Sequence, residues 1–143
     1  MKVKEAMNEL NKINEDIKNL LKKSSECDYG DNINYEDNPN DRMLKNEIYN
    51  VLSMLDDVMI KLDYLNKPIL FEGYLKKNKN RRYELNGIEF TCGNIIEALI
   101  YDDDFYDGKE CWVRSRIEHN GKDYYIISSA DEKIDNLKIR VRG

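Results

Sequence analysis

The residues best suited to chemistry lie in the stretch WVRSRIEH, residues 112–119, and in the tyrosine pair that follows it. In a strand, residues two apart share a face, so several of these side chains are predicted to lie together, pointing away from the core. Arginine beside aromatic rings binds phosphates, carboxylates or stacked bases. The candidate ligand-binding or partner-binding residues are Trp112, Arg114, Arg116, Tyr125 and Glu118.

A structural explanation of the same residues competes with the binding one and is preferred. Arg116 and Glu118 would simply pair on the sheet, while Trp112 would cover an open end of a small barrel. Exposed pairs of this kind are common and contribute little to stability.

Catalytic arrangements find little support. The single histidine, His119, is predicted at a turn, where a catalytic base is difficult to bury. Cys92 is better explained as a small buried hydrophobic residue at a strand end than as a nucleophile. The acidic run Asp102, Asp103 and Asp104 is interpreted as a solvated loop tip. We therefore expect no catalytic residue, no metal and no cofactor.

Composition narrows the class of protein. The chain has 143 residues, 41% hydrophobic and 36% charged, with a net charge of −5 that disfavours non-specific nucleic-acid binding. It has no apolar run long enough to span a membrane and no signal-like N-terminus. Three scattered cysteines argue against a disulfide framework. We expect a cytoplasmic protein without membrane contact.

Two helices are predicted in the first half because apolar residues recur there in alternating steps of three and four. The first seam is Val3, Ala6, Leu10, Ile13, Ile17 and Leu20, and the second is Leu44, Ile48, Val51, Leu55, Val58, Leu62 and Leu65. Asp41, or Asn38 followed by Pro39, is the expected start of the second helix. The acidic segment 24–40 between them is interpreted as a solvated loop, in preference to a calcium loop.

The second helix is apolar over more of its surface than a single partner helix would cover. The extra surface predicts a further partner, either the β domain or another copy of the helices, and a dimer is the favoured assembly. Met54 and Met59 are interpreted as core residues in preference to a peptide groove. The residues expected to mediate self-association are Leu52, Leu55, Met59 and Leu62.

After Pro68 the apolar period changes to two, which indicates strands. Asn86-Gly87 predicts a hairpin that pairs Leu85 with Ile88 and Tyr83 with Phe90 on a core face, and Gly93 predicts a bend. Asn120-Gly121 predicts a second hairpin, whose pairs would be Ile117 with Tyr124, Ser115 with Ile126, Arg116 with Tyr125, and Arg114 with Ile127.

The sequence thus predicts an α+β chain. An antiparallel, coiled-coil-like helical hairpin occupies residues 1–67, and a small antiparallel β-barrel or bent sheet, SH3-like or OB-like, occupies residues 68–143.

Residues 70–142 resemble a short domain of unknown function found in Gram-positive bacteria and their phages and plasmids. The matching positions are Arg82, Tyr83, Cys92, Gly93, Trp112, Ser115, Arg116, Ile117, Glu118, Tyr124, Tyr125, Arg140, Val141 and Arg142. The resemblance implies a small β domain and no assigned activity. This chain departs from the usual short form by its acidic insert, Asp102–Glu110, and by the helices in front.

The leading functional hypothesis is a non-enzymatic binding protein that self-associates through its helices and presents its β domain to a protein partner or a small anionic ligand. One alternative is an anti-defence protein of a phage or mobile element, which mimics nucleic-acid charge or sequesters a nucleotide signal. Another is a nucleic-acid-binding regulator. These hypotheses differ in the salt dependence of binding, which is steep for nucleic acid.

Overall fold

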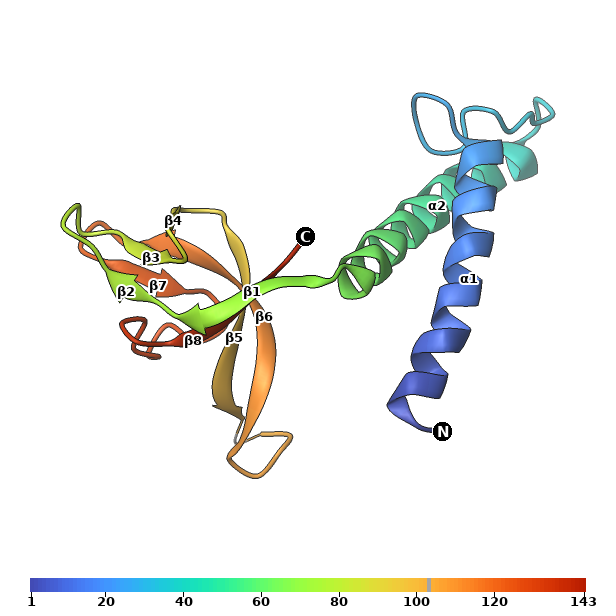
Figure 1. The fold of residues 1–143 in the computed structure, drawn as a ribbon. Helices are drawn as coiled ribbons and strands as arrows, with labels where there is room; N and C mark the ends of the chain where they lie inside the picture. The colour runs from blue at the N-terminus through green and yellow to red at the C-terminus, as the bar shows by residue number, and fades with distance from the viewer. Residues whose placement is uncertain (103) are drawn as a thin grey trace. The chain divides into compact units, whose positions relative to one another are not determined.

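The computed structural model describes residues 1–102 and 104–143, and the chain forms two compact units, Met1–Asn66 and Lys67–Gly143 (Figure 1). The first unit consists of two packed helices and the second of antiparallel sheets, which confirms the α+β class. Asp103, in the middle of the acidic run predicted at the loop tip, lies outside the described residues. No helix in the described part of the chain has the length and apolar content needed to cross a bilayer.

Helix α1 spans Val3–Ser24 and helix α2 spans Pro39–Asn66. The carboxylate of Glu5 accepts a hydrogen bond from the backbone N–H of Lys2 at the start of α1. The side chain of Asn38 accepts the backbone N–H of Asp41 at 3.0 Å, so Asn38 caps α2 and Pro39 occupies its first turn. Of the two predicted starts of this helix, the one at Asn38 and Pro39 is therefore correct.

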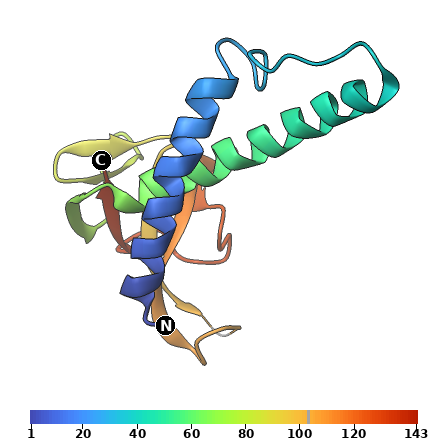
Figure 2. The same cartoon turned by 90° about the vertical axis from the view of Figure 1, so that its right-hand side faces the viewer.

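Helices α1 and α2 pack against each other (Figure 2). Several polar side chains form hydrogen bonds or ion pairs between them. Asn14 donates from Nδ2 to Asp63 at 2.8 Å, and Lys18 approaches the same carboxylate at 2.9 Å. Asn11 and Asn66 are joined by a reciprocal pair of amide hydrogen bonds. The predicted apolar seam of α1 is not its contact face, since four of its six residues are exposed: Val3, Leu10, Ile13 and Leu20.

The acidic segment between the helices is folded by its own hydrogen bonds. The carboxylate of Asp31 accepts the backbone N–H groups of Glu26, Cys27 and Asp28. The hydrogen bonds from Cys27 and Glu26 lower the pKa of Asp31. Lys45 of α2 donates from Nζ to two backbone carbonyl groups of the segment. These hydrogen bonds hold the segment against α2.

The β unit contains eight strands in two antiparallel sheets within the described residues. The five-stranded sheet has the order β1-β8-β5-β6-β7, and the three-stranded sheet has the order β2-β3-β4. The strands are β1 Ile69–Tyr74, β2 Lys76–Lys77, β3 Tyr83–Leu85, β4 Ile88–Phe90, β5 Ile95–Asp102, β6 Lys109–His119, β7 Tyr124–Ile126 and β8 Lys138–Arg142. The described strands form no closed barrel, because β1 and β7 end the larger sheet without pairing with each other.

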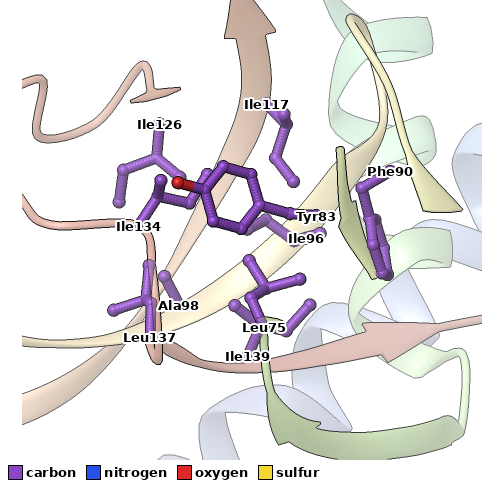
Figure 3. Close-up of a cluster of buried hydrophobic side chains, with 10 residues drawn as sticks. All are labelled: Leu75, Tyr83, Phe90, Ile96, Ala98, Ile117, Ile126, Ile134, Leu137 and Ile139. Atoms are coloured by element: carbon purple, nitrogen blue, oxygen red, sulfur yellow. The ribbon is translucent and has the colours of Figure 1, made fainter. Parts of the chain in front are cut away.

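The core of the β unit is built from both sheets (Figure 3). Its side chains are Leu75, Tyr83, Phe90, Ile96, Ala98, Ile117, Ile126, Ile134, Leu137 and Ile139. Leu75 lies between β1 and β2, where the chain passes from one sheet to the other. It is fully buried, and its backbone N–H donates to Leu137 at 2.9 Å.

The first predicted hairpin register is correct, since Tyr83 pairs with Phe90 and Leu85 with Ile88. Asn86 and Gly87 have φ values of 55° and 75°, as a two-residue turn of this hand requires. Ile88 lies on the predicted face but is exposed, so the prediction that it is part of the core is wrong.

The second predicted register is wrong by two residues. Ile117 pairs with Ile126, Glu118 with Tyr125 and His119 with Tyr124. The turn has four residues, because Oδ1 of Asn120 accepts the backbone N–H groups two and three residues further on. A shift of two leaves each side chain on its predicted face.

Candidate functional site

The predicted binding residues lie on the outer face of the five-stranded sheet. Strand β6 alternates between buried Ser115 and Ile117 and the outward-facing Trp112, Arg114 and Arg116. Two further members of the predicted set, Glu118 and Tyr125, face each other across β6 and β7. The structure therefore places all five predicted residues on one surface, although it does not bring them into one cluster.

A buried carboxylate organises the centre of this outer face. Glu97 of β5 is only 4% exposed, and it pairs with Arg140 and Arg142 of β8. Nε of Arg142 lies 2.6 Å from Oε1, and Nε of Arg140 binds the other carboxylate oxygen. Burial raises the pKa of Glu97, but the hydrogen bonds from Arg142 and Arg140 outweigh it, so the pKa is lowered overall.

An arginine from another strand packs against the ring of Trp112. The guanidinium carbon of Arg140 lies 4.4 Å from the ring centroid. This distance is typical of a cation–π contact, and the side chain of Arg140 is mostly buried there. Trp112 is consequently part of the sheet's internal structure, and the prediction that it frames a ligand beside Arg114 and Arg116 has no support in this packing.

Arg116 pairs with Glu118 along β6. Nε of Arg116 lies 2.6 Å from Oε1 of Glu118, and the arginine side chain is 53% exposed. The pair that the structural explanation predicted is therefore present. At this exposure the pair contributes little to stability, on the order of 1 kcal/mol or less.

A shallow depression of about 390 Å³ opens beside these arginines. Its lining residues are Ile95, Arg114, Ser115, Arg116, Ile127 and Ser128. The volume lies at the small end of the range for ligand pockets. Two arginines, two serines and two exposed isoleucines give it the chemistry of a site for an anionic group attached to an apolar body.

Backbone contacts fix the shape of the depression. Ile127 donates its backbone N–H to the carbonyl of Arg116 at 3.1 Å, and Ser128 donates to Oγ of buried Ser115, also at 3.1 Å. The segment after β7 is thereby held against β6. The predicted residues Trp112 and Tyr125 are not among those that line the depression.

Sequence reasoning did not identify Glu97, Ile95 or Ser128. Glu97 carried a usable signal, since it is a lone carboxylate in the apolar run IIEALI and a buried charge requires a partner. Ile95 and Ser128 carried no such signal in the sequence, because their proximity to Arg114 and Arg116 depends on strand pairing and on the four-residue turn.

Chemically reactive side chains lie elsewhere. Nδ1 of His119 accepts the backbone N–H of Gly121 at 3.1 Å, and its ring packs edge-on against Tyr124. Cys92 is exposed. Among the described residues, no three or more histidine, cysteine or acidic side chains gather as a metal site would require.

The helical residues predicted to mediate self-association differ in accessibility. Leu52 and Leu62 are buried within the chain, whereas Leu55 and Met59 are partly buried. The interpretation of Met54 as a core residue is wrong, since it belongs to a row of exposed apolar residues on α2: Leu44, Val51, Met54, Val58 and Leu65.

Comparison with known protein families finds a match that lies within the β unit. Residues 73–142 match the family described as a domain of unknown function, DUF5348. The resemblance seen in the sequence over residues 70–142 is confirmed to that extent, and the match begins after both helices. Neither the curated proteins nor the solved structures contain a match to this chain.

Proposed function

We propose that this chain is a non-enzymatic binding protein. Its β unit holds an anionic group of a partner in the depression at Arg114 and Arg116, and its helical unit joins copies of the chain. The depression is the observation that carries the first part, because two exposed arginines and two exposed isoleucines border one concave surface. Exposed apolar side chains on α2 support the second part.

The pair with Glu118 is compatible with anion binding at Arg116. It uses Nε of the guanidinium, which has four further N–H donors. Glu118 restricts the side chain and thereby reduces the entropy lost when a ligand is bound. The isoleucines would contact the apolar part of the same ligand and exclude water from the charged contact.

The test is binding of two anionic probes, inorganic pyrophosphate and a hexaglutamate peptide, to the full-length protein. Arg114→Ala combined with Arg116→Ala should weaken binding at least tenfold, since a charge-assisted hydrogen bond contributes about 1.5–3 kcal/mol. The matched control is Lys79→Ala combined with Lys133→Ala, which removes the same charge from exposed positions outside the depression.

The control should bind as the parent does, and both variants should melt near the parent temperature. Parent-like binding by the arginine variant would contradict the proposed site. Unfolding of that variant would show that the two arginines are structural. Tight binding of duplex DNA that weakens steeply with salt would instead favour the nucleic-acid-binding alternative.

A further inference from the structure

One face of α2 carries an exposed seam of five apolar and two charged residues. Its residues, in alternating steps of three and four, are Leu44, Glu47, Val51, Met54, Val58, Lys61 and Leu65. All seven are exposed, and the five apolar members are between 39% and 67% exposed. The seam spans 21 residue steps, or about 32 Å of helix. Such spacing is that of a helix that packs along another helix.

The order of residue types along this seam is symmetric about Met54. Leu44 and Leu65 lie at its ends, and Val51 and Val58 lie on either side of its centre. Glu47 and Lys61 are each seven residues from Met54, and they carry opposite charges. A surface with this symmetry complements itself when a second copy runs in the opposite direction.

We infer that the α2 seam docks a second copy of this chain in antiparallel orientation, with the two-fold axis at Met54. Each leucine then meets a leucine and each valine a valine of the second copy. Glu47 faces Lys61 of the second copy, and this contact occurs twice because the interface is isologous. The inference rests on the self-association in the proposed function and adds its surface and direction.

Charge favours the antiparallel over the parallel arrangement. In a parallel pair Glu47 would face Glu47 of the second copy, and Lys61 would face Lys61 of the second copy. Both contacts would therefore be repulsive. Among the described residues, neither Glu47 nor Lys61 forms an ion pair within the chain. Both charges are therefore available to a second copy.

The first test reverses these charges and measures the dimer dissociation constant by sedimentation. Glu47→Lys alone, or Lys61→Glu alone, places like charges at both contacts and should weaken the dimer roughly tenfold. The two changes together should restore it to within about threefold of the parent. Weakening without restoration would overturn the antiparallel pairing.

The second test is disulfide cross-linking after the native Cys27, Cys92 and Cys111 are replaced by serine. Met54→Cys should cross-link efficiently because the two copies of this position meet at the axis. Glu47→Cys alone should not, since its copies are separated by 14 residue steps, or about 21 Å, far beyond the reach of a disulfide. A mixture of Glu47→Cys and Lys61→Cys chains should cross-link.

The outcomes separate this inference from the proposed function. A monomer of 17.0 kDa at micromolar concentration would contradict self-association altogether. A dimer in which Glu47→Cys cross-links as well as Met54→Cys would preserve self-association and overturn the antiparallel seam. A dimer that persists unchanged when Val51 and Val58 are replaced by glutamate would place the interface on another surface.

Discussion

The guanidinium of Arg140 lies over the ring of Trp112, at 4.4 Å from the ring centroid, while the same guanidinium binds the buried carboxylate of Glu97. One side chain thus connects three strands, since Arg140 is on β8, Glu97 on β5 and Trp112 on β6. The charged groups at the centre of the outer face, Glu97 and Arg140, are consequently held by contacts between strands of the same sheet.

The first prediction concerns Glu97 and acid stability. Its lowered pKa means that the unfolded chain binds a proton at higher pH than the folded chain does. The stabilisation is therefore complete above the ordinary carboxyl pKa near 4.5 and is lost as the pH falls through the lower folded value. Glu97→Gln should unfold with less dependence on pH below about 5 and should lose about 3–5 kcal/mol at pH 7, because two arginines lose their partner.

Urea unfolding at several pH values measures both effects. Glu118→Gln is the control, since it removes a carboxylate from a more exposed arginine pair on the same sheet. It should change the free energy of unfolding by no more than about 1 kcal/mol and should retain the acid sensitivity of the parent. Equal losses for the two variants would contradict the central role of Glu97.

The second prediction concerns the planar contact with Trp112. Arg140→Lys keeps the positive charge beside Glu97 but removes the flat guanidinium, so the free energy of unfolding should fall by about 1–2 kcal/mol. Arg116→Lys should change it by less than about 0.5 kcal/mol because this side chain is exposed. The fluorescence of Trp112, the sole tryptophan, should also change in the first variant and not in the second.

The third prediction concerns the four-residue turn. Asn120→Ala removes the acceptor of two backbone N–H groups, at 2.9 and 3.0 Å, and should reduce stability by about 1–2 kcal/mol. Gly121 has a φ of 93°, so Gly121→Ala should also destabilise the turn. Lys122→Ala, at an exposed position of the same turn, should leave the melting temperature unchanged.

The hairpins show how much of the β unit was predictable. Asn86-Gly87 closes a two-residue turn, so the pairing of Tyr83 with Phe90 followed from the sequence. Asn120-Gly121 has the same two residue types as Asn86-Gly87, but the Asn120 side chain organises a four-residue turn. The pairs between β6 and β7 are therefore shifted by two residues. The shift is even, so the predicted faces were still correct.

Contacts between strands or helices distant in the sequence were not predictable in this way. The pairing of Glu97 with Arg140 depends on β8 inserting between β1 and β5, an order that local periodicity does not contain. In the helices, the periodicity predicted the two helical segments correctly, but it did not predict which of their apolar residues are buried. It did not reveal that Asn14 would donate a hydrogen bond to Asp63 of the other helix, nor that Leu10 and Ile13 would be exposed.

The last prediction is that residues 67–143 fold without the helices. All ten buried residues of the core cluster lie in this range, and so does the match to DUF5348. Contacts at the chain ends are also internal to it, since Gly143 donates its backbone N–H to Pro68 and Arg142 donates to the carbonyl of Lys67. A domain of this size buries a smaller share of its surface than a larger one, so its stability should be only a few kcal/mol. Its amide spectrum should be dispersed and should overlay the β-unit resonances of the full chain, with cooperative unfolding in urea. A collapsed spectrum would show that the helices supply part of the β unit's stability, and the two units would then have to be treated as one folding domain.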